Sequence, residues 1–155
     1  MIRFGYEERI EATPEAVFAV MSDIGRFNEW LDMDGRPSDV GPVGQGSRFE
    51  SSGQLGPIRY AGSGEVTAFV PDHRFGFRYQ KPKSFDFEIE MQLDPVDGGT
   101  RLVGKGSMTT HGLWRLLEPV FRMELGKGEA REARRLKAIV EGAEAPRAPA
   151  VGSGW

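Results

Sequence analysis

The chain has 155 residues, a formal net charge of −3 and no cysteine. A domain of this length buries about 70% of the surface that its unfolded chain exposes, so we expect one domain with a full hydrophobic core. The acidic balance argues against a general nucleic-acid binder, and the lack of cysteine excludes disulfides, thiol catalysis and cysteine-ligated zinc.

The first residues predict a strand followed by two short helices. Residues 2–11 alternate between apolar and polar side chains, with Glu8 as a polar side chain on the apolar face. Thr13 and Pro14 then mark the start of a helix, because threonine caps backbone N–H groups and proline fits the first turn. A second short helix is expected from Ile24 to Trp30.

The next segment, residues 32–46, is rich in glycine, proline and aspartate and predicts a loop with a short edge strand near residues 36–40. The run from Asp32 to Gly35 resembles the start of a calcium loop, but no glutamate stands at the closing position. The two histidines lie far apart in the sequence, with no short-spaced partner. We therefore expect no metal and no cofactor.

Five further strands are expected from alternation and turn signals. The clearest is residues 85–94, where every second residue from Phe85 to Leu93 is apolar and the others are polar. Such a strand has one face in water, which is typical of an antiparallel sheet. A hairpin turn is predicted at Asp97-Gly98-Gly99. The other strands are expected at residues 47–52, 58–70, 73–80 and 100–109.

Residues 112–142 are the only long stretch with helical periodicity, and we expect one long helix across the sheet. Its apolar residues form two stripes, which a count of 3.6 residues per turn places on different faces: Leu113, Leu117, Val120, Phe121 and Leu125, then Ala133, Leu136 and Val140. Between them lie Gly126 and Gly128, each costing about 1 kcal/mol relative to alanine. Either the glycines only weaken the helix, or they form a hinge that opens a cavity.

The order of elements predicts an α+β architecture, with helices on one face of an antiparallel sheet. Near the end of the long helix, Arg131, Arg134, Arg135 and Lys137 are interleaved with glutamates, a pattern typical of a solvated face.

Residues 1–142 should form the single domain, and residues 143–155 should be a disordered tail, because small residues and proline bury too little surface. No apolar run approaches the roughly 18 residues of a membrane helix. The first residues also lack the apolar core of a signal peptide, so we expect a cytoplasmic protein without a membrane span.

Several stretches resemble the START-like (SRPBCC) superfamily, and within it the polyketide cyclase/dehydrase-like branch that is grouped with birch-pollen-allergen (Bet v 1) proteins. The stretches are residues 10–18, 23, 27–30, 41–48, 64–71, 98–102 and 136–141. The resemblance implies the helix-grip fold, a curved antiparallel sheet of six to seven strands that grips the last helix and leaves a ligand cavity between them. Members of this superfamily bind lipids, hormones, quinones or polyketides, and only some catalyse a reaction.

On this basis we expect the inward-facing apolar residues to line a cavity, although a plain packed core needs the same residue types. The expected ligand-binding residues are Phe18, Trp30, Phe49, Phe75, Phe77, Tyr79, Phe85, Phe87, Ile89, Met91, Met108, Trp114, Leu117 and Phe121. No catalytic residue is assigned. The weak candidates are Glu8, since a buried carboxylate can act as an acid or base, together with Tyr60 and His111.

Three functions follow as hypotheses. The first is a binding module for a small hydrophobic molecule, possessing no nucleic-acid partner and forming a monomer or weak homodimer. The second is an enzyme of the same fold, a polyketide cyclase or dehydratase, in which the cavity positions a reactive chain. The third is a co-chaperone-like protein-interaction module that uses the outer face of the sheet.

Overall fold

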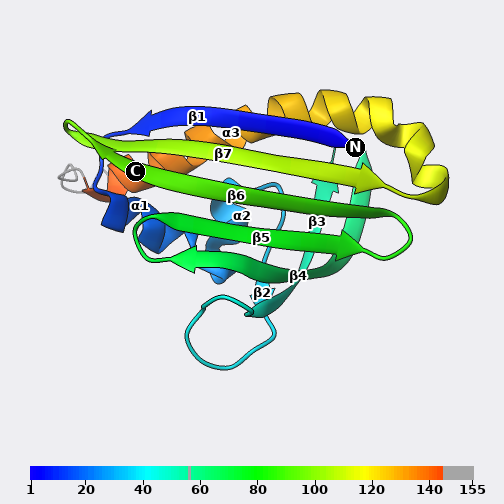
Figure 1. Ribbon diagram of the computed structural model, residues 1–155, viewed down its shortest axis with the longest axis horizontal. Helices are drawn as coiled ribbons and strands as arrows, with labels where there is room; N and C mark the ends of the chain where they lie inside the picture. Colours follow the sequence, from blue (N-terminus) through cyan, green and yellow to red (C-terminus); the bar gives the residue numbers. More distant parts are fainter. Residues whose placement is uncertain (56, 145–155) are drawn as a thin grey trace, which may run out of the picture.

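The computed structural model describes residues 1–55 and 57–144, and its centre is a seven-stranded antiparallel sheet (Figure 1). The strands lie in the order β1-β7-β6-β5-β4-β3-β2, so the first strand pairs with the last. Their bounds are β1 (Ile2–Ile10), β2 (Arg36–Pro37), β3 (Arg48–Leu55), β4 (Ile58–Val70), β5 (Arg74–Lys81), β6 (Phe85–Val96) and β7 (Gly99–Thr110).

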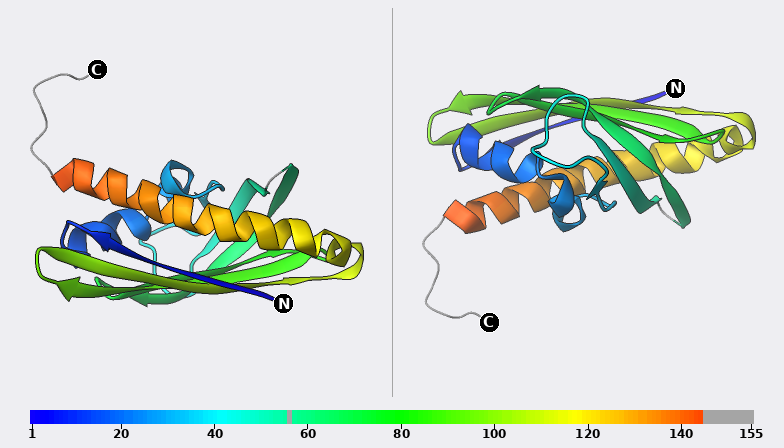
Figure 2. Two further views of the ribbon diagram at one scale, coloured as in Figure 1. Left: turned by 90° about the horizontal axis from the view of Figure 1, so that it is seen from above. Right: turned by 90° about the horizontal axis from the view of Figure 1, so that it is seen from below.

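All helices lie on one side of this sheet, and Figure 2 shows α3 running along that face with α1 and α2 beside it. Their bounds are α1 (Pro14–Met21), η1 (Ile24–Arg26), α2 (Phe27–Trp30), η2 (Gly112–Leu117) and α3 (Glu118–Glu144). The predicted α+β, helix-grip architecture is therefore confirmed. Within the described ranges, no helix is long and apolar enough to cross a membrane.

The local signals in the sequence act as expected at the end of the sheet where β1 stops and β6 turns into β7. Thr13 Oγ1 accepts a hydrogen bond from the Ala16 N–H group at 3.1 Å, and Pro14 begins α1. The hairpin between β6 and β7 turns at Asp97 and Gly98, where φ of Gly98 is +77°, a value that glycine adopts readily. These caps and turns fix where each element begins.

The long C-terminal helix differs from the prediction at its start. Residues 112–117 form a 3₁₀ helix, which has 3.0 residues per turn, so the count of 3.6 misplaces their side chains. Leu113, predicted to face inward, is 82% exposed. Inward-facing positions in this segment are instead taken by Trp114 and Leu117, which pack against the core.

Beyond Glu118 the helix is continuous through Gly126 and Gly128 and ends at Glu144, two residues later than predicted. Phe121 and Leu125 of the first stripe and the whole second stripe are buried, so their placement on different faces was wrong. Gly128 and Glu132 are also buried, and they join the two stripes into one face that follows the sheet. The disordered tail was predicted to begin at residue 143, but residues 143 and 144 belong to α3. The rest of that prediction, residues 145–155, lies outside the described residues.

Candidate functional site

A small cavity lies between α3 and the sheet, with about 50 Å³ of free space. Its floor comes from the inner faces of β5, β6 and β7, and its roof from α3 and the segment that follows α2. The floor residues are Phe77, Tyr79, Phe85, Phe87, Ile89, Met91 and Met108, and the roof includes Leu31, Met33, Leu125 and Gly128.

The alternation of β6 explains this floor. Phe85, Phe87, Ile89 and Met91 occupy every second position, so all four side chains point to the helix side of the sheet. Phe87 also stacks on Phe4 of the edge strand β1, with ring centroids 5.4 Å apart. One strand with strict alternation therefore supplies much of an apolar, partly aromatic wall.

Polar side chains gather at the rim of the cavity. Asp32, Gln54, Tyr60, Glu124 and Glu132 all line it, and they come from the loop after α2, from β3 and β4, and from α3. An apolar pocket with a few polar groups at one end is typical of sites for small organic ligands.

At this rim, Asp32 clamps α3 to the body of the protein. Its carboxylate accepts hydrogen bonds from Arg131 and Arg135, each at 2.7 Å. The Asp32 N–H group donates to the buried carboxylate of Glu132 at 2.8 Å. We call these four residues the Asp32 clamp.

The clamp also changes the ionisation of Asp32. Partial burial alone would raise the pKa of this carboxyl group, but the hydrogen bonds and charges of Arg135 and Arg131 outweigh burial and hold its pKa below the ordinary value. The basic cluster on α3 is therefore not simply a solvated face, since Arg131 and Arg135 fix the helix over the cavity. Lys137 likewise donates to the Arg9 carbonyl at 2.7 Å.

Two tyrosines in the cavity differ in their environment. The Tyr79 hydroxyl donates to the Ser51 carbonyl at 2.8 Å, and burial raises the pKa of this phenol well above its ordinary value, so it stays neutral. Tyr60 packs edge-on against Tyr79 and Phe85, with centroids 5.5 and 5.3 Å away. Tyr79 is thus tied to the main chain, whereas Tyr60 stands at the polar rim.

Seven of the fourteen residues expected to bind ligand line the cavity, and they are the seven floor residues named above. The other seven do not line it. Four of them pack with Phe27 between the sheet and the helices α1 and α2: Phe18, Trp30, Phe49 and Phe75. We call these five residues the aromatic cluster. Trp114, Leu117 and Phe121 lie at the end of the cavity nearest η2, where Trp114 packs on Phe85 and Phe121 at 5.8 and 5.9 Å.

The three weak catalytic candidates are not brought together. Glu8 is half-buried on β1 opposite Leu102 and does not line the cavity. His111 follows β7, and its Nε2 lies 2.8 Å from Asp86 Oδ2 in an exposed pair. Only Tyr60 lines the cavity. Among the residues that the structure describes, no group of three or more histidine, aspartate or glutamate side chains is placed to hold a metal ion.

Sequence reasoning missed most of the rim. Glu132 carried a usable signal, because it lies four residues before Leu136 and four after Gly128, on the buried face of α3. Asp32 carried none, since its role depends on two arginines about a hundred residues away.

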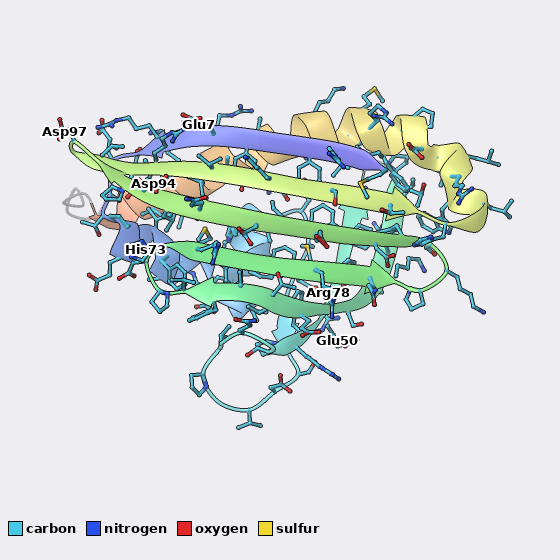
Figure 3. The ribbon with its side chains drawn as sticks, viewed as in Figure 1. Glu7, Glu50, His73, Arg78, Asp94 and Asp97 are labelled. Atoms are coloured by element: carbon cyan, nitrogen blue, oxygen red, sulfur yellow. The ribbon has the colours of Figure 1, made fainter. Side chains whose placement is uncertain are left out.

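The outer face of the sheet carries charged, solvent-exposed side chains. Figure 3 shows Glu7 and Arg78 on this face, which is turned away from α3. Cross-strand ion pairs cover it: Arg101 with Glu7, Arg78 with Glu65, and Arg74 with Glu90. Such pairs suit solvent better than the desolvated centre of a protein interface.

Comparison with known proteins identifies a family whose sequence profile matches nearly the whole chain. The sequence profile of a family described as "Polyketide cyclase / dehydrase and lipid transport" matches residues 1–141. A search of curated proteins found no significant match.

Solved structures with the same fold cover almost the whole chain. TTHA0849 from Thermus thermophilus aligns with a TM-score of 0.75 at 17% identity, covering 92% of this chain and 99% of that one. The Zhui aromatase/cyclase from Streptomyces sp. R1128 aligns with a TM-score of 0.77 at 9% identity, covering 92% and 95%. Ara h 8.0201 aligns with a TM-score of 0.66 at 14% identity, covering 89% and 96%. At these identities the similarity shows the fold alone.

Proposed function

Because the chain belongs to the polyketide cyclase/dehydrase and lipid transport family, we propose that it binds a small, largely apolar and aromatic molecule in the cavity under α3. The observation that carries this proposal is the cavity itself, whose floor is aromatic and methionine-rich and whose rim is polar. Aromatic rings and methionine sulfur both make favourable contacts with flat aromatic ligands.

The orientation of the ligand follows from the rim. Its apolar part would lie against Phe87, Met91 and Met108, and a hydroxyl or carbonyl group would reach Gln54 or Tyr60. A charged carboxylate on the ligand is disfavoured, since Glu124 and Glu132 stand at the same rim. We therefore expect a neutral, oxygen-bearing, polyketide- or quinone-like compound.

The cavity has to grow to hold such a ligand. Its free space of about 50 Å³ is far below the roughly 300 Å³ at the lower end of ligand pockets. Two features of the roof and floor favour expansion: Gly126 and Gly128 weaken the helix above, and methionine side chains below repack easily. This is the hinge interpretation of the glycine pair.

Native mass spectrometry of the purified protein tests the proposal directly. We expect a bound neutral compound of a few hundred daltons that is released on denaturation. If the host supplies no ligand, titration with the fluorescent probe 1-anilinonaphthalene should still show saturable binding. Absence of both a released compound and saturable probe binding would overturn the proposal.

A matched pair of glycine variants locates the binding. Gly128 lines the cavity, and a side chain added there meets its first neighbour only at 3.7 Å, so Gly128→Leu should fill the free space. Gly142 is exposed on the same helix, outside the cavity, and an added side chain there meets nothing within 4 Å, so Gly142→Leu is the control. We expect the first variant to lose probe binding and the second to keep it; equal binding by both would contradict a site under α3.

A second candidate function is a cyclase or dehydratase that uses the same cavity. Tyr60 favours it, because its phenol stands at the rim with Glu124, and an acid and a base are what an enolising cyclisation needs. Tyr60 would donate a hydrogen bond to a substrate carbonyl while Glu124 accepts a proton. Tyr60→Phe should then lower turnover of a poly-β-ketone substrate far more than it weakens binding of that substrate, whereas Glu8→Gln should leave turnover unchanged.

A further inference from the structure

The end of the molecule formed by η2 and the start of α3 lies at the right of Figure 1. Apolar side chains are exposed at this end. Leu113, Leu116 and Met123 are 82%, 77% and 53% exposed. Leu113 and Leu116 lie three apart and eclipse on the 3₁₀ helix η2, and Pro119 and Met123 lie four apart on one face of α3. The exposed apolar stripe runs from the first pair to the second. Trp114, Leu117 and Phe121 form the opposite, inward stripe.

Basic side chains surround this stripe. They come from η2, from the first turns of α3 and from the β5–β6 turn, which lies beside them because Ser84 accepts a hydrogen bond from His111 N–H. The cations are Lys81, Lys83, Arg115, Arg122 and Lys127. Among the described residues nearby, Asp86 pairs with His111, and Glu118 pairs with Arg122, one of these five cations. Glu124, next to Met123, lines the cavity.

The sign of this charge opposes that of the whole chain, which is −3. We call the three exposed apolar residues and the five cations the basic tip. Leucine and methionine stand at its centre and lysine and arginine at its margin, an arrangement typical of segments that lie in the interface of an anionic bilayer.

We infer that the basic tip docks on the surface of a membrane that contains anionic phospholipids. The leucines enter the boundary between head groups and acyl chains, and the cations contact lipid phosphates. A second copy of this chain fits less well, because two identical tips facing each other would bring like charges together. A nucleic acid would use the cations but leave the leucines exposed.

The position of the tip adds a reason for docking there. Trp114 joins the tip to the cavity, because its ring packs on Phe85 of the cavity floor at 5.8 Å and lies under Lys81 Nζ at 5.6 Å. Docking at the tip would therefore bring an apolar ligand in the bilayer to Trp114, and movement of this one ring would admit it to the cavity. This last step rests on the proposed function, whereas docking itself does not.

Co-sedimentation with vesicles tests the inference. The full chain should sediment with vesicles of phosphatidylcholine mixed with phosphatidylglycerol, much less with phosphatidylcholine alone, and less as salt is raised. The double variant Leu113→Ser/Leu116→Ser should bind at least about tenfold more weakly, since each leucine side chain contributes its apolar transfer. Circular dichroism should show the same fold, because neither side chain is buried.

Val40→Ser is the matched control, because Val40 is an equally exposed apolar residue in the loop after β2, outside the tip. It should sediment like the unchanged protein. No binding to the mixed vesicles, or equal loss in the control, would overturn the inference. Loss of self-association in the leucine variant, measured by analytical ultracentrifugation without vesicles, would assign the tip to a second copy instead.

Gly128→Leu separates this inference from the proposed function. It should stop probe binding in the cavity and leave vesicle binding unchanged, since Gly128 lies outside the tip. Failure of ligand binding and failure of docking are therefore seen in different measurements.

Discussion

The aromatic cluster and the cavity rest on the same sheet, yet only the cluster is filled. Phe75 of β5 packs in the cluster, and Phe77 and Tyr79 of the same strand line the cavity. The floors are alike, and the roofs differ. Over the cluster, α1 and α2 supply Phe18, Phe27 and Trp30, whereas α3 covers the cavity with Leu125, Gly128 and Glu132. A roof of aliphatic side chains, a glycine and a glutamate leaves free space where a roof of rings does not.

Truncation of a ring in the cluster should give the largest effect. Phe27 is fully buried and contacts Trp30, Phe49, Phe75 and Phe77. Phe27→Ala should therefore lower the free energy of unfolding by about 4 kcal/mol, because a rigid site cannot collapse around the lost ring.

Met108→Ala, in the cavity floor, is the variant to compare with Phe27→Ala in the aromatic cluster. It should cost about 2 kcal/mol, at the lower end for such changes, because Met108 already borders free space. Urea unfolding of both variants measures the difference. Equal losses would mean that the two regions are packed alike.

Asp32→Asn should loosen the roof of the cavity. Losing the charge weakens two hydrogen bonds to Arg131 and Arg135, and we expect a loss of about 1–2 kcal/mol at neutral pH, between the values for exposed and buried charged pairs.

The pH dependence of that loss has a defined sign. The folded-state pKa of Asp32 is lowered, so its contribution is complete above the unfolded pKa and disappears as the pH falls through the folded pKa, below about 4. The stability curves of the two proteins should therefore converge in acid. Asp97→Asn, in an exposed turn, is the control, and its free energy of unfolding at neutral pH should stay within about 0.5 kcal/mol of the original.

Tyr79→Phe should cost about 1–2 kcal/mol, since the buried Ser51 carbonyl loses its hydroxyl donor. Probe binding should persist, because the ring that forms the wall is retained. Tyr60→Phe should do the opposite: it should weaken ligand binding more than it lowers the free energy of unfolding. Thermal unfolding and probe titration of both variants decide the matter, and a stable Tyr79→Phe protein would contradict the structural role.

Gly126→Ala should give the smallest change and the opposite sign. The position is exposed and helical with nothing within 4 Å, so alanine should raise stability by up to about 1 kcal/mol. Gly98→Ala should lower it, because φ of +77° strains any residue with a Cβ atom. A rise in melting temperature for Gly126→Ala and a fall for Gly98→Ala would show that only the turn at Gly98 requires a glycine backbone conformation.

Alternation, capping and turn residues were enough to predict the sheet, because these signals act within a few residues. The floor of the cavity followed from them: Phe85, Phe87, Ile89 and Met91 were placed on one face of β6 from the sequence alone. Which of the inward residues meet free space could not be predicted, since this depends on the roof that each one faces.

The rest of the site depends on contacts between distant segments. Asp32 meets Arg131 and Arg135 only after α3 has crossed the sheet, and no local pattern records that meeting. The outward turn of Leu113 was missed for a different reason: a 3₁₀ helix cannot be told from an α-helix by its apolar residues.

The pairing of β1 with β7 sets the order in which the protein can fold. Among the described residues, β1 lies at the edge of the sheet and pairs with β7 alone. α3 packs along β1, and Glu141 of α3 accepts a hydrogen bond from the Glu11 N–H group at 2.8 Å, across 130 residues of sequence. During synthesis, β1 therefore cannot form its native contacts until β7 and α3 have left the ribosome. Such distant contacts slow folding, and the cavity should close last, after the hairpins of β3 to β7 have formed.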